Sequence, residues 1–145
     1  MRIKSPAFEE NQPIPVTFTC NGENHNPPLE FTDVPSETQS LALIMDDPDA
    51  ASGIFTHWLI WNIPPEAIKI EEGIVPEGSE EGLNSAGQKG YMGPCPPSGT
   101  HRYFFKLYAL NKRFSVSSNI TKKELEDEIS NSLVDKAEFI GTYGK

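Results

Sequence analysis

Residues 40–63, SLALIMDDPDAASGIFTHWLIWNI, contain two strongly apolar segments joined by a turn-rich connection. The first segment, 40–46, is almost continuously apolar and has the length of a strand, so we expect a buried strand there. Residues 55–63 are apolar at both alternating sets of positions, which is typical of a central strand with both faces covered. If these two strands pair antiparallel, the end of the first lies beside the start of the second.

Other alternating or apolar runs predict further strands on both sides of this pair. They are 15–20 (PVTFTC), 29–35 (LEFTDVP), 101–110 (HRYFFKLYAL) and a short final strand in 137–143 (AEFIGTY). The acidic stretch 63–82 is interrupted by Pro and Gly, so we expect it to be irregular and on the surface.

One helix is expected near the C-terminus. Thr121 and Glu124 have the spacing of a capping box. Leu125, Ile129 and Leu133 follow at intervals of four and form one apolar stripe. Several strands followed by a late helix predict a mainly β fold, an antiparallel β-sandwich with one peripheral helix in its C-terminal region. The 145 residues are enough for one domain and show no repeat or linker, so a single domain over 1–145 is expected.

Composition and charge exclude several classes of function. The formal net charge of −9 argues against nucleic acid as a partner, because phosphates would be repelled. No cluster of basic residues suits an anionic membrane surface and no apolar stretch could span one, so we expect no stable membrane insertion. Cys20 and Cys95 are too few for a disulfide framework, and the N-terminus lacks the apolar segment of a secretory signal. We therefore expect reduced thiols and a cytoplasmic location.

Three ionisable residues lie at expected strand ends beside turn-rich loops. Asp47 follows 40–46, while His57 and His101 open the two most aromatic strands. Each has an ordinary interpretation: a turn aspartate, a core histidine and a solvated loop-end histidine. Their joint placement favours a site at one rim of the sheet, because rigid strands hold residues there that loops leave accessible.

The loop GPCPPSG at 93–99 supplies a second part of this expected site. Its prolines restrict the backbone, so the shape of the loop is largely predetermined. The backbone N–H groups of Cys95, Ser98, Gly99 and Thr100 could converge on a small anion. A rigid surface turn is the alternative, and the sequence leaves open whether a cis bond occurs.

Metal and covalent chemistry are less well supported. Two histidines and an aspartate could bind Zn²⁺, but they lack the usual ligand spacing, and we expect neither a metal nor a cofactor. The start of a calcium loop at 47–53 fails because Trp58 occupies the position that requires Glu. Cys95 could act as a nucleophile with His101 as its base, and Ser98 is an alternative nucleophile. Neither residue lies in a sequence context that is typical of catalytic nucleophiles.

Three segments together resemble the phosphatidylethanolamine-binding protein family, in particular its bacterial and archaeal branch, which is often described as Raf kinase inhibitor-like. They are DDPDAASGIFTHWLIWNIP, GQKGYMGPCPPSGTHRYFFKLYALN and AEFIGTY. The resemblance implies an antiparallel β-sandwich with a small pocket for phosphate, acetate or phosphorylated head groups. By motif, the pocket residues it implies are Asp47, His57, Cys95, Pro96, Pro97, His101 and Tyr103, the last as a hydroxyl donor. Ala51 and Leu83 depart from the pattern, which often has Pro and Arg at these positions.

The residues favour a non-catalytic protein that binds a small phosphorylated or carboxylate ligand and has a regulatory or inhibitory role. In this hypothesis His57 and His101 both donate to the ligand, and Asp47 orients a histidine and keeps it charged. Binding is then expected to weaken above pH ~7. A different class is inhibition of a serine protease or a kinase through surface loops. Hydrolysis by Asp47, His57 and His101 is disfavoured, since no nucleophile or metal completes the site. A homodimer is left open.

Overall fold

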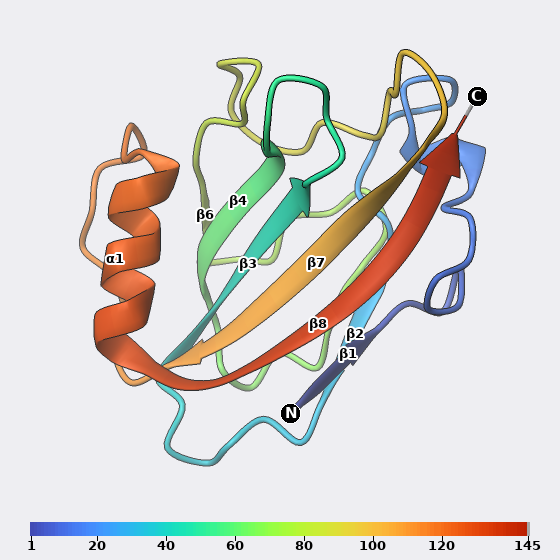
Figure 1. The fold of residues 1–145 in the computed structure, drawn as a ribbon. Helices are drawn as coiled ribbons and strands as arrows, with labels where there is room; N and C mark the ends of the chain where they lie inside the picture. Colours follow the sequence, from blue (N-terminus) through green and yellow to red (C-terminus); the bar gives the residue numbers. More distant parts are fainter. Residues whose placement is uncertain (145) are drawn as a thin grey trace.

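The computed structural model describes residues 1–144 as two antiparallel sheets with one helix against the outer face of the larger sheet (Figure 1). The smaller sheet has the order β1 (Arg2–Lys4), β2 (Leu29–Thr32), β5 (Lys69–Ile70). The larger sheet has the order β6 (Glu80–Glu81), β4 (Phe55–Ile63), β3 (Ser40–Asp47), β7 (Thr100–Leu110), β8 (Leu133–Gly144). The helix α1 spans Lys122–Ser132. The expected mainly β sandwich with a peripheral helix is confirmed.

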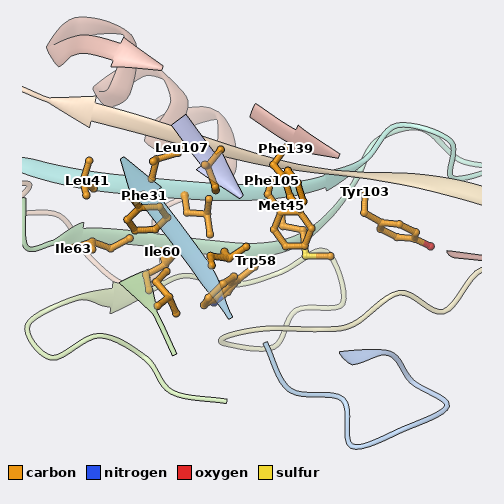
Figure 2. Close-up of a cluster of buried hydrophobic side chains, with 14 of the residues drawn as sticks. Phe31, Leu41, Met45, Trp58, Ile60, Ile63, Tyr103, Phe105, Leu107 and Phe139 are labelled. Atoms are coloured by element: carbon orange, nitrogen blue, oxygen red, sulfur yellow. The ribbon is translucent and has the colours of Figure 1, made fainter. Parts of the chain in front are cut away.

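Alternation along β3 and β4 separates two hydrophobic cores. Inward residues of these strands, such as Leu41 and Trp58, pack between the sheets (Figure 2). Their neighbours on the opposite face, such as Ile44 and Trp61, pack under α1. Because both faces are covered, every residue of β3 is buried. This is why the sequence of the strand is apolar without a period of two.

The register of the sheet brings three strand ends to one rim. β3 pairs antiparallel with β4, with Asp47 opposite Phe55, and with β7, with Asp46 opposite Phe104. The last residue of β3 therefore lies beside the first residues of β4 and β7. The expected juxtaposition of Asp47 with the start of the strand that carries His57 is confirmed.

The C-terminal elements match the expectation in part. Thr121 caps α1, its hydroxyl accepts from the Glu124 amide, and the Glu124 carboxylate accepts from the Thr121 amide. Leu125 and Ile129 are buried, but Leu133 is 41% exposed and already belongs to β8. The final strand is longer than predicted, because it pairs with β7 along its whole length.

The prediction of a strand over residues 15–20 is wrong. Val16–Phe18 form a 3₁₀ helix, in which the amide and hydroxyl of Thr19 both donate to the carbonyl of Val16. These local bonds take the place of a ladder, and the apolar Phe18 is buried at the end of the sandwich. The sequence also did not reveal the short strands β1, β5 and β6. Within residues 1–144, no helix is long and apolar enough to cross a membrane.

Candidate functional site

A cavity of about 220 Å³ opens at the rim where β3, β4 and β7 meet. Its lining comes from these strands, from the connection after β3 and from the loop before β7. The lining residues are Asp47, Ala50, Ala51, Phe55, His57, Met92, Cys95, Pro96, Pro97, His101 and Tyr103. All seven pocket residues implied by the family resemblance therefore lie on one cavity.

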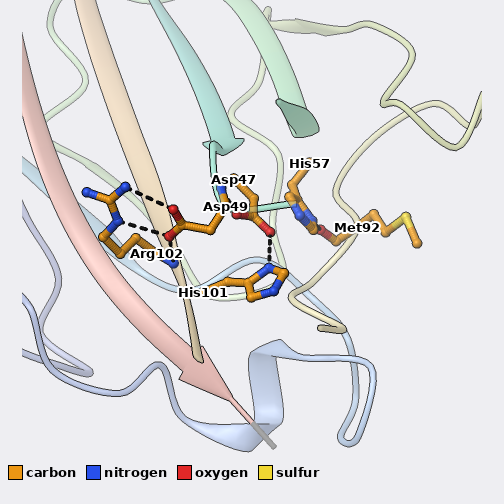
Figure 3. Close-up of polar contacts among 6 residues, drawn as sticks. All are labelled: Asp47, Asp49, His57, Met92, His101 and Arg102. Carbon is orange, nitrogen blue, oxygen red and sulfur yellow. Dashed lines mark hydrogen bonds and ion pairs between the residues drawn. The ribbon is translucent and has the colours of Figure 1, made fainter. Parts of the chain in front are cut away.

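Asp47 holds the ring of His101. Its Oδ2 lies 2.7 Å from Nδ1 of His101, and both side chains are buried (Figure 3). The other carboxylate oxygen accepts the amide of Asp49 at 2.8 Å. Asp47 is thus both the turn residue of the ordinary interpretation and the orienting carboxylate of the functional one. Nδ1 carries a proton toward the carboxylate, so the polar atom of His101 left for another partner is Nε2.

His57 is held by backbone rather than by a carboxylate. Its Nδ1 donates to the carbonyl of Met92 at 2.6 Å, and the amide of Met92 returns a bond of 3.0 Å to the carbonyl of His57. Burial lowers the pKa of His57, and the Met92 carbonyl and the Asp47 charge oppose this only in part. A neutral ring in this tautomer presents a lone pair at Nε2. This differs from the expectation that both imidazoles donate to the ligand.

Tyr103 carries a buried hydroxyl with no hydrogen-bond partner among the described residues. Its ring lies edge-on to His57, with centroids 5.3 Å apart, and stacks with His101 at 6.4 Å. In Figure 2 its hydroxyl points away from the other labelled core side chains. Burial, reinforced by the charges of Asp47 and Asp49, raises the pKa of Tyr103, so the hydroxyl keeps its proton and can donate.

The expectation of reduced thiols is wrong. Cys20 and Cys95 form a disulfide, with Cα atoms 5.4 Å apart. The amide of Cys20 donates to the carbonyl of Pro94 at 3.1 Å, and this contact places the two side chains side by side. Because Cys95 is in a disulfide, it cannot be the nucleophile considered above.

The loop before β7 is fastened to residues 16–24 by further contacts. The amide of Gly93 donates to Oδ1 of Asn24 at 2.8 Å, and the hydroxyl of Tyr91 donates to the carbonyl of Phe18 at 2.7 Å. A Cβ on Gly93 would lie only 2.3 Å from that same carbonyl oxygen, so only glycine fits. Of the amides expected to face an anion, only that of Cys95 belongs to a lining residue, while Ser98, Gly99 and Thr100 lie outside the lining.

Several contributions were not found from the sequence. Met92 fixes the tautomer of His57 through its carbonyl, which no side-chain pattern could reveal. Arg102 forms two side-chain bonds of 2.9 Å to Asp49 and holds the connection after β3 (Figure 3). Of the two departures, Ala51 lines the cavity and Leu83 does not. Within residues 1–144, no group of three or more His, Cys, Asp and Glu is arranged to hold a metal ion.

Comparisons with known proteins agree with this architecture. The sequence model of the family described as phosphatidylethanolamine-binding protein matches residues 4–144. A UPF0098 protein of Methanothermobacter thermautotrophicus is 45% identical, over 99% of this chain and 98% of its own. The crystal structure of CT736 from Chlamydia trachomatis, titled a homologue of phosphatidylethanolamine-binding protein, has a TM-score of 0.95 at 39% identity and covers 99% of this chain and 97% of its own. The crystal structure of the Escherichia coli protein YbcL has a TM-score of 0.92 at 27% sequence identity, and the match covers 99% of this chain and 98% of YbcL. The chain therefore belongs to the phosphatidylethanolamine-binding protein family, in its bacterial and archaeal UPF0098 and YbcL-type branch.

Proposed function

We propose that the protein is a non-catalytic binding protein for a small oxyanion, such as phosphate, a phosphorylated head group or a carboxylate, which occupies the cavity. The observation that carries this proposal is the hydroxyl of Tyr103. A buried polar group without a partner costs free energy, so a ligand that accepts from this hydroxyl would remove that cost. The imidazole of His101, oriented by Asp47, adds a second polar group on the same cavity.

The chemistry of the lining supports binding rather than turnover. Its one cysteine, Cys95, is in a disulfide, and among the described residues no serine or lysine lines the cavity. The two imidazoles that line it are held by short hydrogen bonds, His57 to Met92 at 2.6 Å and His101 to Asp47 at 2.7 Å. Such preorganised groups suit recognition, because little conformational freedom is lost when a ligand arrives.

Isothermal titration with inorganic phosphate and with acetate tests the proposal. We expect one site per chain, and Tyr103→Phe should weaken binding roughly tenfold or more, since a hydrogen bond to a charged group is lost. His25→Ala is the matched control, because His25 is a histidine outside the cavity that pairs with Glu23 and Glu72. Absence of binding to both anions by the wild-type protein would contradict the proposal.

A second candidate function is inhibition of a serine protease or a kinase through the loop 93–99. The disulfide favours it, because Cys95 and Pro97 are exposed on a loop whose backbone is braced and so loses little freedom on docking. Inhibition by micromolar protein, measured against a panel of proteases and kinases, tests this. Inhibition retained in Tyr103→Phe would assign it to the loop surface rather than to the bound anion.

A further inference from the structure

We propose that the cavity binds its oxyanion together with one proton, so that it selects the monoanion of a phosphate monoester and rejects phosphate diesters. This inference rests on the proposed function and adds the class of ligand. It follows from three features: the acceptor that His57 presents at Nε2, the donor that Tyr103 presents at its hydroxyl, and the absence of Lys and Arg from the part of the lining that the structure describes.

The tautomer of His57 makes it an acceptor toward the cavity. A carbonyl oxygen can only accept, so the 2.6 Å contact with Met92 places the proton of the ring on Nδ1. The amide of Met92 donates in return to the carbonyl of His57, so the two residues are held together at a second point. Nε2 has no hydrogen-bond partner among the described residues, while the side chain lines the cavity. A ligand beside Nε2 therefore satisfies it best with an O–H group.

The charges around His57 do not favour a ligand that carries two negative charges. Asp46 and Asp47 act on it from β3, and His101 acts on it from β7, where Tyr103 also packs against its ring. The loop 93–99 carries no charged residue. Arg102 is the nearest guanidinium in sequence to these groups, but it is bound to Asp49 and does not line the cavity. Because residues 1–144 place no Lys or Arg in the lining, a second negative charge on the ligand would have no permanently charged partner among them.

Tyr103 and His57 together match a monoester monoanion. The tyrosine hydroxyl donates to a charged phosphoryl oxygen, and Nε2 of His57 accepts the single P–O–H. A diester has no proton to give, so one of its oxygen lone pairs would face that of Nε2. Transfer of the proton from the ligand to His57 would give a phosphate dianion beside an imidazolium. The complex contains the same proton in either form, so the selection is unchanged.

Titration with methyl phosphate and dimethyl phosphate tests the inference. At pH 6 we expect methyl phosphate to bind at least roughly tenfold more tightly than dimethyl phosphate, since the diester leaves a buried acceptor unpaired. At pH 8, where the free monoester is mainly a dianion because its second pKa is about 6, binding should take up about one proton. That uptake is measured by repeating the titration in buffers of different ionisation enthalpy.

His57→Gln provides the decisive variant. A glutamine amide can turn its N–H₂ toward the cavity, so this variant should bind dimethyl phosphate about as well as methyl phosphate. His25→Gln, the matched control outside the cavity, should keep the wild-type preference. Equal affinity of the wild-type protein for the two esters would overturn the inference while leaving the proposed function intact. Failure to bind either ester, inorganic phosphate or acetate would overturn both.

Vesicles separate a lipid source of the monoester from a soluble one. Phosphatidic acid carries a monoester and phosphatidylethanolamine a diester. Sedimentation with phosphatidic acid vesicles, displaced by methyl phosphate, would support the inference with a lipid as the source. Binding of methyl phosphate without sedimentation would support it with a soluble source. Sedimentation with phosphatidylethanolamine vesicles that methyl phosphate displaces would overturn it.

Discussion

The cavity has two walls that are built in different ways. The strand wall carries Asp47, His57, His101 and Tyr103 on β3, β4 and β7, whose ladder places their side chains. The loop wall consists of residues 91–97, which contain no regular element and are fastened to residues 16–24. The strand wall is held by contacts repeated along a sheet, so the loss of one has a limited effect. The loop wall depends on a few individual bonds, so we expect it to be more sensitive to single changes.

Removal of the disulfide should have the largest effect. The double substitution Cys20→Ser with Cys95→Ser opens a loop closed over a sequence separation of 75. Chain-entropy arithmetic for a loop of this size gives a loss of about 4 kcal/mol in the free energy of unfolding. Urea denaturation of the variant and the oxidised wild-type protein measures it. An unchanged urea midpoint would show that the loop wall does not depend on this bond.

Gly93→Ala tests the same wall without changing its covalent links. The added methyl group would lie 2.3 Å from the carbonyl oxygen of Phe18 and 2.5 Å from Oδ1 of Asn24, so the loop must move away. Overpacking of this kind costs about 2 kcal/mol. The measurement is the thermal midpoint, and phosphate affinity should fall with it as Cys95 and Pro96 shift. Ser98→Ala, in the same loop but exposed and outside the lining, is the control and should change neither.

The two walls also differed in how well the sequence predicted them. Asp47, His57 and His101 were found because strand periodicity and turn residues mark strand ends locally. An antiparallel ladder then brings such ends together. The disulfide and the contacts of Asn24 with Gly93 join segments about 70 residues apart in sequence, so no local pattern reports them. Residues 15–20 alternate as a strand does, yet Val16–Phe18 form a 3₁₀ helix, and Cys20, two residues beyond it, bonds to this distant loop.

Chemical detail was harder to predict than position, even on the strand wall. The sequence placed His57 at the site but not its tautomer, because the tautomer depends on a backbone carbonyl of the loop wall. His101 takes its tautomer from Asp47, a residue of the same wall that the motif already contained. Both histidines therefore direct Nδ1–H to a protein acceptor and leave Nε2 for another partner. They differ in what holds them: His57 is held by the loop wall, and His101 by a residue of its own strand wall.

Tyr103→Phe should move stability and binding in opposite directions. The hydroxyl is buried without a partner in the described chain, so its removal should stabilise the ligand-free protein by about 1 kcal/mol. Phosphate affinity should fall in the same variant. Denaturation with and without saturating phosphate measures both effects, and the stabilisation by ligand should be smaller than in the wild-type protein. Loss of stability in the ligand-free variant would mean that the hydroxyl has a protein partner in solution.

The smallest effect is expected at the ion pair beside the strand wall, and it should appear only in acid. The bonds from Arg102 lower the pKa of Asp49 from 3.8 to about 2. A carboxylate with a lowered pKa in the folded state stabilises the fold above its unfolded pKa, and that contribution is lost as the pH falls from about 4 toward 2. Asp49→Asn should therefore unfold at nearly the wild-type temperature at pH 2 and slightly lower at pH 6. The pair is partly exposed, so the difference at pH 6 should shrink with added salt. A large, salt-independent difference would instead mean that the strand wall needs the connection after β3 as much as the loop wall needs its disulfide.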